Sequence, residues 1–382
     1  QPSTQPNQQV VIFSISLHRR FEKHFRIKHL RSAFFGFIPV FFLQSIVLVY
    51  NRPVKKLIIA GVVLLGILFI ISRFTELQEV LLVLQKGNWL WLGAAFVLLF
   101  GWILVTAATF KTLFSLVGVD KSLLQVLRLF LAVNFINLVA PSAGMSGMVV
   151  FYSDAQKNGH STARMMVGSA LFLIFDYCGL LTIIFFGLII LAFYQVLWAF
   201  EIFAFILFFL FVTAMISVVY LASRSEEHLS RLLLKITRFF NHATGMLFKK
   251  TAISEDRVIR FAAEISEGVK AIQNLRNGWV RPAGLTILNK LLLVSILGMM
   301  FLAFGTPVTA GQLIAGFSIA YLFVIISPTP AGIGIVEGLL TFALTSLAVP
   351  IEAAAVITLS FRGYTFWLPF LFGMISFRSL HS

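Results

Sequence analysis

The sequence predicts an all-α, polytopic integral membrane protein with about six full spans and two helix pairs that are broken by proline and glycine. Of its 382 residues, 59% are hydrophobic and 12% are charged, whereas soluble domains carry about 25% charged residues. The mean hydropathy is +0.95. Apolar runs such as residues 90–110 and 165–192 are long enough to cross a hydrocarbon core of about 30 Å. The alternating pattern of β-barrel strands is absent from the sequence.

The formal net charge of +15 raises the question of nucleic acid. The basic residues gather in loops beside the apolar segments, which favours the positive-inside rule and attraction to anionic lipid head groups. We therefore expect membrane lipids as partners, anionic phospholipid above all, and no nucleic acid. Cys178 is the single cysteine, which excludes an intrachain disulfide and a cysteine zinc cage. The histidines show no metal-ligand spacing, so we expect no metal and no cofactor.

Two regions are expected along the chain. Residues 1–54 form a basic N-terminal arm followed by a short apolar stretch, 33–50, which is either interfacial or an extra membrane segment. Residues 55–378 form the transmembrane domain. Its first span is predicted over residues 57–72, and 74–85 has the pattern of an amphipathic helix that lies at the opposite interface.

Five further full spans follow from apolar length and from the loop charges. They are predicted over residues 90–110, 165–192, 200–222, 282–304 and 351–377. Between the fourth and fifth spans of the chain, residues 223–281 hold eleven Lys/Arg against six Asp/Glu. Apolar residues recur at helical spacing here, which predicts two amphipathic helices at the cytoplasmic face. The protein is then a multi-pass protein of the cell membrane with this basic segment inside.

Two similar breaks interrupt the remaining apolar segments. PSAGMSG at 141–147 lies between residues 123–140 and a short helix from 148, and PTPAGIG at 328–334 lies between 313–327 and 335–347. The loop charges place the entrance of the first pair inside and that of the second outside, as in an inverted repeat with broken helices. Re-entrant hairpins and pairs of full crossings give the same charges, so both stay open. The residues that break the helices are Pro141, Gly144, Gly147, Pro328, Pro330, Gly332 and Gly334.

Glu337 directly follows the second break, and Arg362 lies inside the last span. A charge inside a span costs about 2.5–3.5 kcal/mol on insertion scales, so each needs a reason. Glu337 is a candidate for binding a cationic head group or a proton, or for capping the loop and pairing with a basic residue. Arg362 is a candidate for holding a lipid phosphate, or for neutralising Glu337.

Four more polar residues inside apolar segments are candidates for substrate binding. Asp176 either lines a cavity or forms a structural ion pair, and Lys290 either binds substrate or extends toward the interface. Asn134 and Asn137 either contact substrate or hydrogen-bond neighbouring helices.

Three blocks of sequence resemble the flippase-like membrane family typified by the N-terminal membrane domain of lysylphosphatidylglycerol synthase (multiple peptide resistance factor). They are NFINLVAPSAGMSGMVVFYSDAQKNG at 134–159, LFLIFDY with Asp176, and SPTPAGIGIVEG at 327–338 with FRGYTFWLPFLFGMISFR at 361–378. This chain departs from the family in having Met145 and Ser146 where many members place an acidic residue. The synthase's soluble transferase domain is not expected in this chain.

The resemblance implies a lipid translocase, or flippase, that moves phospholipid or a lipid-linked intermediate between leaflets. We therefore expect a transport protein and not an enzyme. The alternatives are a membrane scaffold that does not transport and docks a separate synthase or glycosyltransferase, and a secondary transporter of a soluble solute. Homo-oligomerisation and a partner synthase both stay open.

Overall fold

A computed structural model describes residues 74–139, 147–231, 233–235, 237–238, 255–270, 278–326 and 334–381. Over these residues the chain is helical and contains no strand. Five helices are long and apolar enough to cross a membrane: α5 (Trp89–Leu116), α8 (Thr162–Phe193), α9 (Ala199–Arg224), α12 (Val280–Ala303) and the continuous run Ile351–Arg378. The protein is therefore an all-α, multi-pass membrane protein, as predicted. The predictions for residues 1–54 and for the span 57–72 concern residues outside the described ranges.

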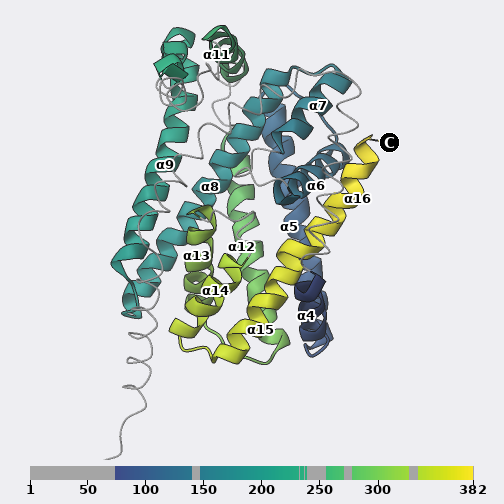
Figure 1. The fold of residues 1–382 in the computed structure, drawn as a ribbon, viewed down its shortest axis with the longest axis vertical. Helices are drawn as coiled ribbons and strands as arrows, with labels where there is room; N and C mark the ends of the chain where they lie inside the picture. Colours follow the sequence, from purple (N-terminus) through teal and green to yellow (C-terminus); the bar gives the residue numbers. More distant parts are fainter. Residues whose placement is uncertain are drawn as a thin grey trace, which may run out of the picture. The chain divides into compact units, whose positions relative to one another are not determined.

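Two halves of the chain repeat one order of elements. The first half comprises α5, α6 (Leu123–Val139), α7 (Met148–Asn158) and α8; the second comprises α12, α13 (Ala310–Ile326), α14 (Ile335–Ser346) and the run α15 (Ile351–Arg362), η2 (Gly363–Trp367) and α16 (Leu368–His381). The start of α5 meets the end of α12, where Asn88 N donates to Ala303 O at 2.8 Å. These helices therefore run in opposite directions (Figure 1), and the two halves have inverted topology.

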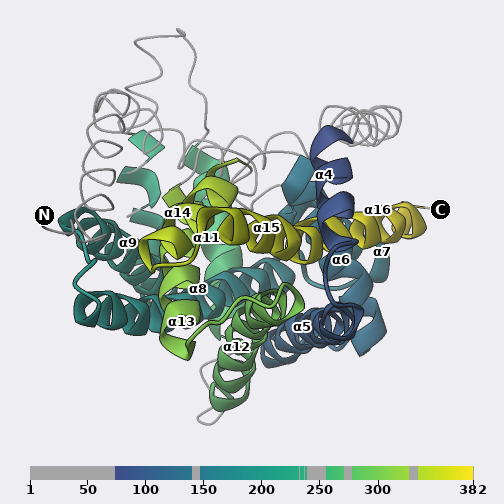
Figure 2. The same cartoon turned by 90° about the horizontal axis from the view of Figure 1, so that it is seen from below.

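Both broken pairs are re-entrant hairpins. Lys121, just before α6, forms an ion pair at 2.6 Å with Asp154 near the end of α7, so this hairpin begins and ends at the same side. Gln312 in the first turn of α13 donates to Leu347 O, just after α14, at 2.8 Å, and closes the second hairpin in the same way. The first hairpin opens at the end that carries the helix α11 (Glu255–Lys270) (Figure 1), which we call the α11 end. The second opens at the opposite end, where α14 and α15 lie nearest the viewer in Figure 2.

The halves pack on each other reciprocally. The first helices of the two halves, α5 and α12, pack together along the centre, and each re-entrant hairpin lies against the last helix of the other half, α6 on α16 and α13 on α8. A glycine sits at each of these last two crossings. A Cβ at Gly187 would lie 2.0 Å from Ser318 Oγ of α13, and one at Gly373 would lie 2.5 Å from Leu131 O of α6. Close backbone approach is therefore built into both crossings.

The helices α4 (Phe74–Leu84), α9 and α11 lie outside this repeat. The predicted amphipathic segment at 74–85 forms α4, which packs on α15 and η2, and α9 packs along α8. At the α11 end, α11 (Glu255–Lys270) has the strongest amphipathic pattern among these helices. Its apolar residues Val258, Ala262 and Val269 are buried, and Ser266 Oγ donates to Ala222 O at 3.0 Å. Much of its amphipathic pattern thus reflects packing on α8 and α9.

Candidate functional site

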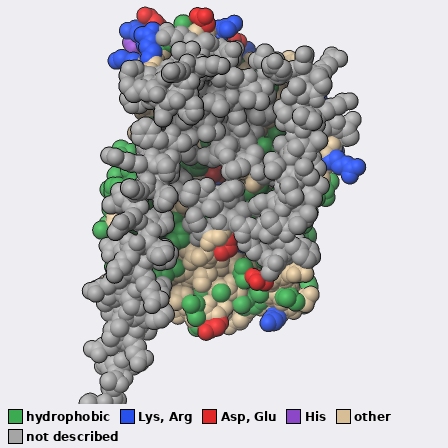
Figure 3. Space-filling model, viewed as in Figure 1, with side chains coloured by type: hydrophobic (Ala, Val, Ile, Leu, Met, Phe, Trp, Pro, Cys, Tyr) green, Lys and Arg blue, Asp and Glu red, His purple; other side chains and the backbone are tan. Residues whose placement is uncertain are grey.

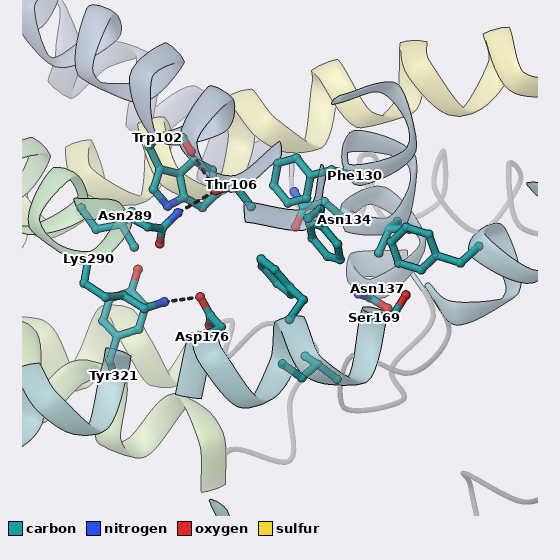
Figure 4. A pocket seen from close by; sticks show the side chains of 16 residues that line it. Trp102, Thr106, Phe130, Asn134, Asn137, Ser169, Asp176, Asn289, Lys290 and Tyr321 are labelled. Atoms are coloured by element: carbon teal, nitrogen blue, oxygen red, sulfur yellow. Dashed lines mark hydrogen bonds and ion pairs between the residues drawn. The ribbon is translucent and has the colours of Figure 1, made fainter. Parts of the chain in front are cut away.

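A polar cavity of about 250 Å³ lies inside the helix bundle, between α5, α6, α7, α8, α12 and α13 (Figure 4). Four of these helices belong to the first half, and α12 and α13 belong to the second, so the cavity lies where the halves meet. Rings of phenylalanine form its apolar walls, including Phe110 and Phe172, which stack with centroids 3.6 Å apart. The residues labelled in Figure 4 also line the cavity: Trp102, Thr106, Phe130, Asn134, Asn137, Ser169, Asp176, Asn289, Lys290 and Tyr321.

An ion pair forms one wall of this cavity. Lys290 Nζ of α12 lies 2.5 Å from Asp176 Oδ1 of α8. The Lys290 side chain is 6% exposed and that of Asp176 is 26% exposed, so the ammonium is buried while the carboxylate reaches the open volume. Each charge alone would be costly inside a span. Because the two neutralise each other, the pair accounts for the presence of both residues in the membrane domain. Both residues were predicted from the sequence as candidates for substrate binding, but an ion pair between them was not predicted.

A second group of polar side chains lies beside this pair and lines the same cavity. Asn289 Nδ2 donates to Thr106 Oγ1 at 2.7 Å, and the Thr106 hydroxyl donates to the carbonyl of Trp102 at 2.7 Å. The Trp102 indole N–H is buried and has no hydrogen-bond partner among the described residues. A buried donor without an acceptor is costly. This N–H has almost no accessible surface, so a ligand oxygen would reach it only if neighbouring side chains moved. Sequence analysis missed these three residues because Thr and Trp are ordinary in spans; only the position of Asn289, next to Lys290, gave a signal.

The two asparagines of α6 have different roles. Asn134 and Asn137 both line the cavity. Asn137 Oδ1 also accepts from the backbone N–H of Gly147, just before α7, at 2.7 Å, so it ties the two arms of the first hairpin together. A Cβ at Gly147 would lie 2.4 Å from Val133 Cγ1, which explains the glycine. Pro141 and Gly144 of the same break lie outside the described residues.

Glu337 and Arg362 form a second ionic cluster, at the second hairpin. Glu337 Oε2 accepts from the Gly334 N–H at 2.6 Å, and its Oε1 accepts from Arg362 Nε at 2.6 Å. Gly334 has φ +78°, a conformation that favours glycine. The Arg362 guanidinium lies over the Phe366 ring at 4.5 Å. Both structural roles that the sequence suggested for Glu337, capping and pairing, are therefore present. Pro328, Pro330 and Gly332 lie outside the described residues.

The predicted site residues thus divide into two clusters. Asp176, Lys290 and the asparagines border the cavity, whereas Glu337 and Arg362 are not among the residues that line it. Tyr321 of α13 also lines the cavity, where its ring stacks on that of Phe317.

The fold and the cavity define a polytopic helical membrane protein with two inverted halves, each with a re-entrant hairpin, around a polar interior. The chain belongs to the family described as "Lysylphosphatidylglycerol synthase TM region", whose model matches residues 57–373. The resemblance seen in the sequence is therefore confirmed. Membership relates the chain to membrane domains of lipid modification or translocation. No curated protein and no solved structure matches the chain.

Proposed function

We propose that this protein is a lipid translocase that passes the polar head group of a phospholipid or of a lipid-linked intermediate through the cavity. The observation that carries this proposal is the Lys290–Asp176 pair in a polar volume inside a bundle of apolar helices. Polar and ionisable residues inside a membrane domain mark substrate pathways. The acyl chains would stay in the hydrocarbon.

The volume of the cavity suits this division of the lipid. About 250 Å³ accommodates a small polar group together with a few waters, not a whole two-chain lipid. A polar lining lowers the barrier to translocation because it replaces part of the hydration that the head group loses in hydrocarbon. Lys290 would bind the phosphate, and Trp102 Nε1 would donate to one of its oxygens if neighbouring side chains moved.

The ion pair would allow substrate to enter without leaving a bare charge. While the cavity holds no head group, Asp176 neutralises Lys290. When a phosphate binds Lys290, the Asp176 carboxylate would instead pair with a cationic group of the substrate or take up a proton. Transport would then be passive or ion-coupled, with either Asp176 or Glu337 as the proton carrier.

We also propose the orientation of the protein. At the α11 end, Arg224 lies in the last turn of α9, Arg231, Lys235 and Arg238 follow it, and Arg260 lies on α11 (Figure 3). By the positive-inside rule this end faces the cytoplasm, in the cell membrane. The first hairpin would then enter from the cytoplasm and the second from outside.

Leaflet exchange in liposomes tests the proposal. The purified chain is reconstituted with fluorescent phosphatidylglycerol, phosphatidylethanolamine or phosphatidylcholine, and exchange is followed with a membrane-impermeant quencher. We expect faster exchange than in protein-free liposomes for at least one head group. Unchanged exchange for every lipid would refute translocation and favour the scaffold.

A bulky substitution in the cavity provides the matched control. Asn134→Trp places an indole in the volume, while Thr213→Trp places the same group on an exposed position of α9. We expect Asn134→Trp to slow exchange at least about tenfold, equivalent to a barrier about 1.4 kcal/mol higher, and Thr213→Trp to leave it unchanged. Equal exchange in both variants would exclude this cavity as the route.

A further inference from the structure

A second, larger cavity of about 720 Å³ lies between α8, α9, α11 and α12. It is distinct from the head-group cavity, because it lies on the opposite face of α8: Asp176 lines the first cavity, whereas Phe175 and Cys178 line the second. We call this second cavity the α9–α12 groove. Most of its lining is apolar, with Ile174 and Leu171 of α8 at its base.

The groove opens onto the surface that faces lipid. Its side walls come from α9 and α12, which both pack on α8. Its rim carries Ile216 and Tyr220 of α9, 44% and 57% exposed, and Ile287 of α12, 36% exposed. Both walls belong to helices long and apolar enough to span a membrane, so these exposed apolar side chains lie against acyl chains. An acyl chain is therefore the group that meets this groove first.

A basic group lies at the α11 end of the groove. Arg224 is in the last turn of α9, one turn beyond Tyr220; its guanidinium lies 5.4 Å from the Tyr220 ring, and its Nε donates to the Tyr220 hydroxyl at 3.2 Å. Arg224 has no carboxylate partner among the described residues. This is the end of the spanning helix, which is the depth of lipid phosphates. A guanidinium at this depth is well suited to bind one.

The base of the groove contains a polar group without a partner. Thr286 lines the groove and is 4% exposed, and its hydroxyl has no hydrogen-bond partner among the described residues. Its methyl group is packed toward Gly179, where a Cβ would lie 2.4 Å away. The Thr286 hydroxyl has almost no accessible surface, so the base of the groove presents apolar groups to an acyl chain.

We infer that the α9–α12 groove binds an anionic phospholipid, with one acyl chain between α9 and α12 and the phosphate at Arg224. Lipid tails are as apolar as the groove, so burial of an acyl chain there adds little hydrophobic driving force. The selectivity must therefore come from Arg224 and from the shape of the groove. The inference concerns binding and does not depend on the proposed translocation.

Photolabelling tests the acyl-chain site. The full chain is reconstituted in phosphatidylcholine vesicles that contain a phosphatidylglycerol with a diazirine in one acyl chain, and labelled residues are mapped by mass spectrometry. We expect labelling of Ile174 and Cys178, inside the groove, above that of exposed Leu291 on the outer face of α12. Uniform labelling of exposed apolar positions, with Ile174 and Cys178 unlabelled, would overturn the site.

A pair of neighbouring substitutions keeps this test specific. Ala283 is exposed and lines the groove, whereas Gly284 is exposed and a Cβ there meets nothing within 4 Å. We expect Ala283→Phe to lower labelling of Cys178 about tenfold, equivalent to about 1.4 kcal/mol of lost affinity, and Gly284→Phe to leave it unchanged. Equal labelling in both variants would refute the groove.

A second pair tests the phosphate contact. Arg231 is also near the α11 end, but it is exposed and lies 3.3 Å from Glu227. We expect Arg224→Gln, and not Arg231→Gln, to reduce labelling by phosphatidylglycerol to the level given by a phosphatidylcholine probe with the same diazirine chain. Wild-type labelling that is equal for the two lipids would overturn the anionic selectivity. Because the readout is binding, this result is independent of the exchange assay.

Discussion

The Lys290–Asp176 pair allows the structural and the transport role of buried charge to be separated in one set of variants. Asp176→Asn leaves the Lys290 ammonium, whose side chain is 6% exposed, without its counter-charge. Removal of one partner of a buried pair costs about 3–5 kcal/mol. We expect the lower value, about 3 kcal/mol, because the Asp176 side chain is 26% exposed to the cavity and water can enter there. Lys290→Met leaves the less buried carboxylate and should cost less.

The double variant, Asp176→Asn with Lys290→Met, removes both charges at nearly constant volume. Replacement of a whole buried pair by uncharged groups is often neutral, so we expect its unfolding free energy to return to within about 1 kcal/mol of the wild type. The coupling between the two sites would then be about 2 kcal/mol or more, which a double-mutant cycle resolves. Unfolding in mixed detergent micelles supplies the stability values, and leaflet exchange is measured on the same preparations.

The unfolding free energy and the rate of leaflet exchange should respond differently to the double variant. If Lys290 binds the head group, the double variant is as stable as the wild type but exchanges lipid no faster than protein-free liposomes. Wild-type exchange in a stable double variant would show that the pair only neutralises itself. Strictly additive losses of stability would refute the pair as an energetic unit, whatever its distance.

Two other substitutions test the second hairpin and the symmetric packing. We expect Glu337→Gln to fold, because the amide oxygen can still accept from Gly334, but to be about 3 kcal/mol less stable, because buried Arg362 loses its counter-charge. We also expect it to lose lipid exchange; retained exchange would leave Glu337 a structural role alone. We expect Gly373→Ala to destabilise the protein by about 1–3 kcal/mol, as overpacking does, because the new Cβ would lie 2.5 Å from the Leu131 carbonyl oxygen. The control variant is Gly284→Ala, whose Cβ meets open space and which should be neutral or stabilising in a helix. Thermal unfolding of both glycine variants checks this difference, and equal stability would count against the tight crossing of α6 and α16.

The membrane class and the positions of the spans followed from the sequence because apolar length is a local property. The predicted span 165–192 lies within α8, and 200–222 lies within α9. The similarity of PSAGMSG and PTPAGIG also predicted the inverted repeat. Loop charges could not decide between hairpins and full crossings, because both leave the chain at the same side. That decision needed contacts distant in sequence, such as Lys121 with Asp154 and Gln312 with Leu347.

The candidate site was predicted in part, for a physical reason. Charged residues inside spans stand out in sequence because they are costly there, so Asp176, Lys290, Glu337 and Arg362 were all found. Their partners depend on which helices cross. Glu337 and Arg362 were paired correctly, whereas Asp176 and Lys290 were not joined, because α8 and α12 are separated by 86 residues of chain. Trp102 carries no signal in sequence at all, since only its burial without a partner sets it apart.

The symmetry of the fold is broken at the two ionic clusters, and this asymmetry bears on how transport would proceed. Each hairpin has a cap at the start of its second helix, but Gly147 is held by the neutral Asn137, whereas Gly334 is held by Glu337, which also binds Arg362. The cap that borders the polar cavity is therefore neutral, whereas the cap of the second hairpin is part of an ion pair. In the proposed translocation, a head group would meet a neutral cap at the first hairpin and a charged one at the second.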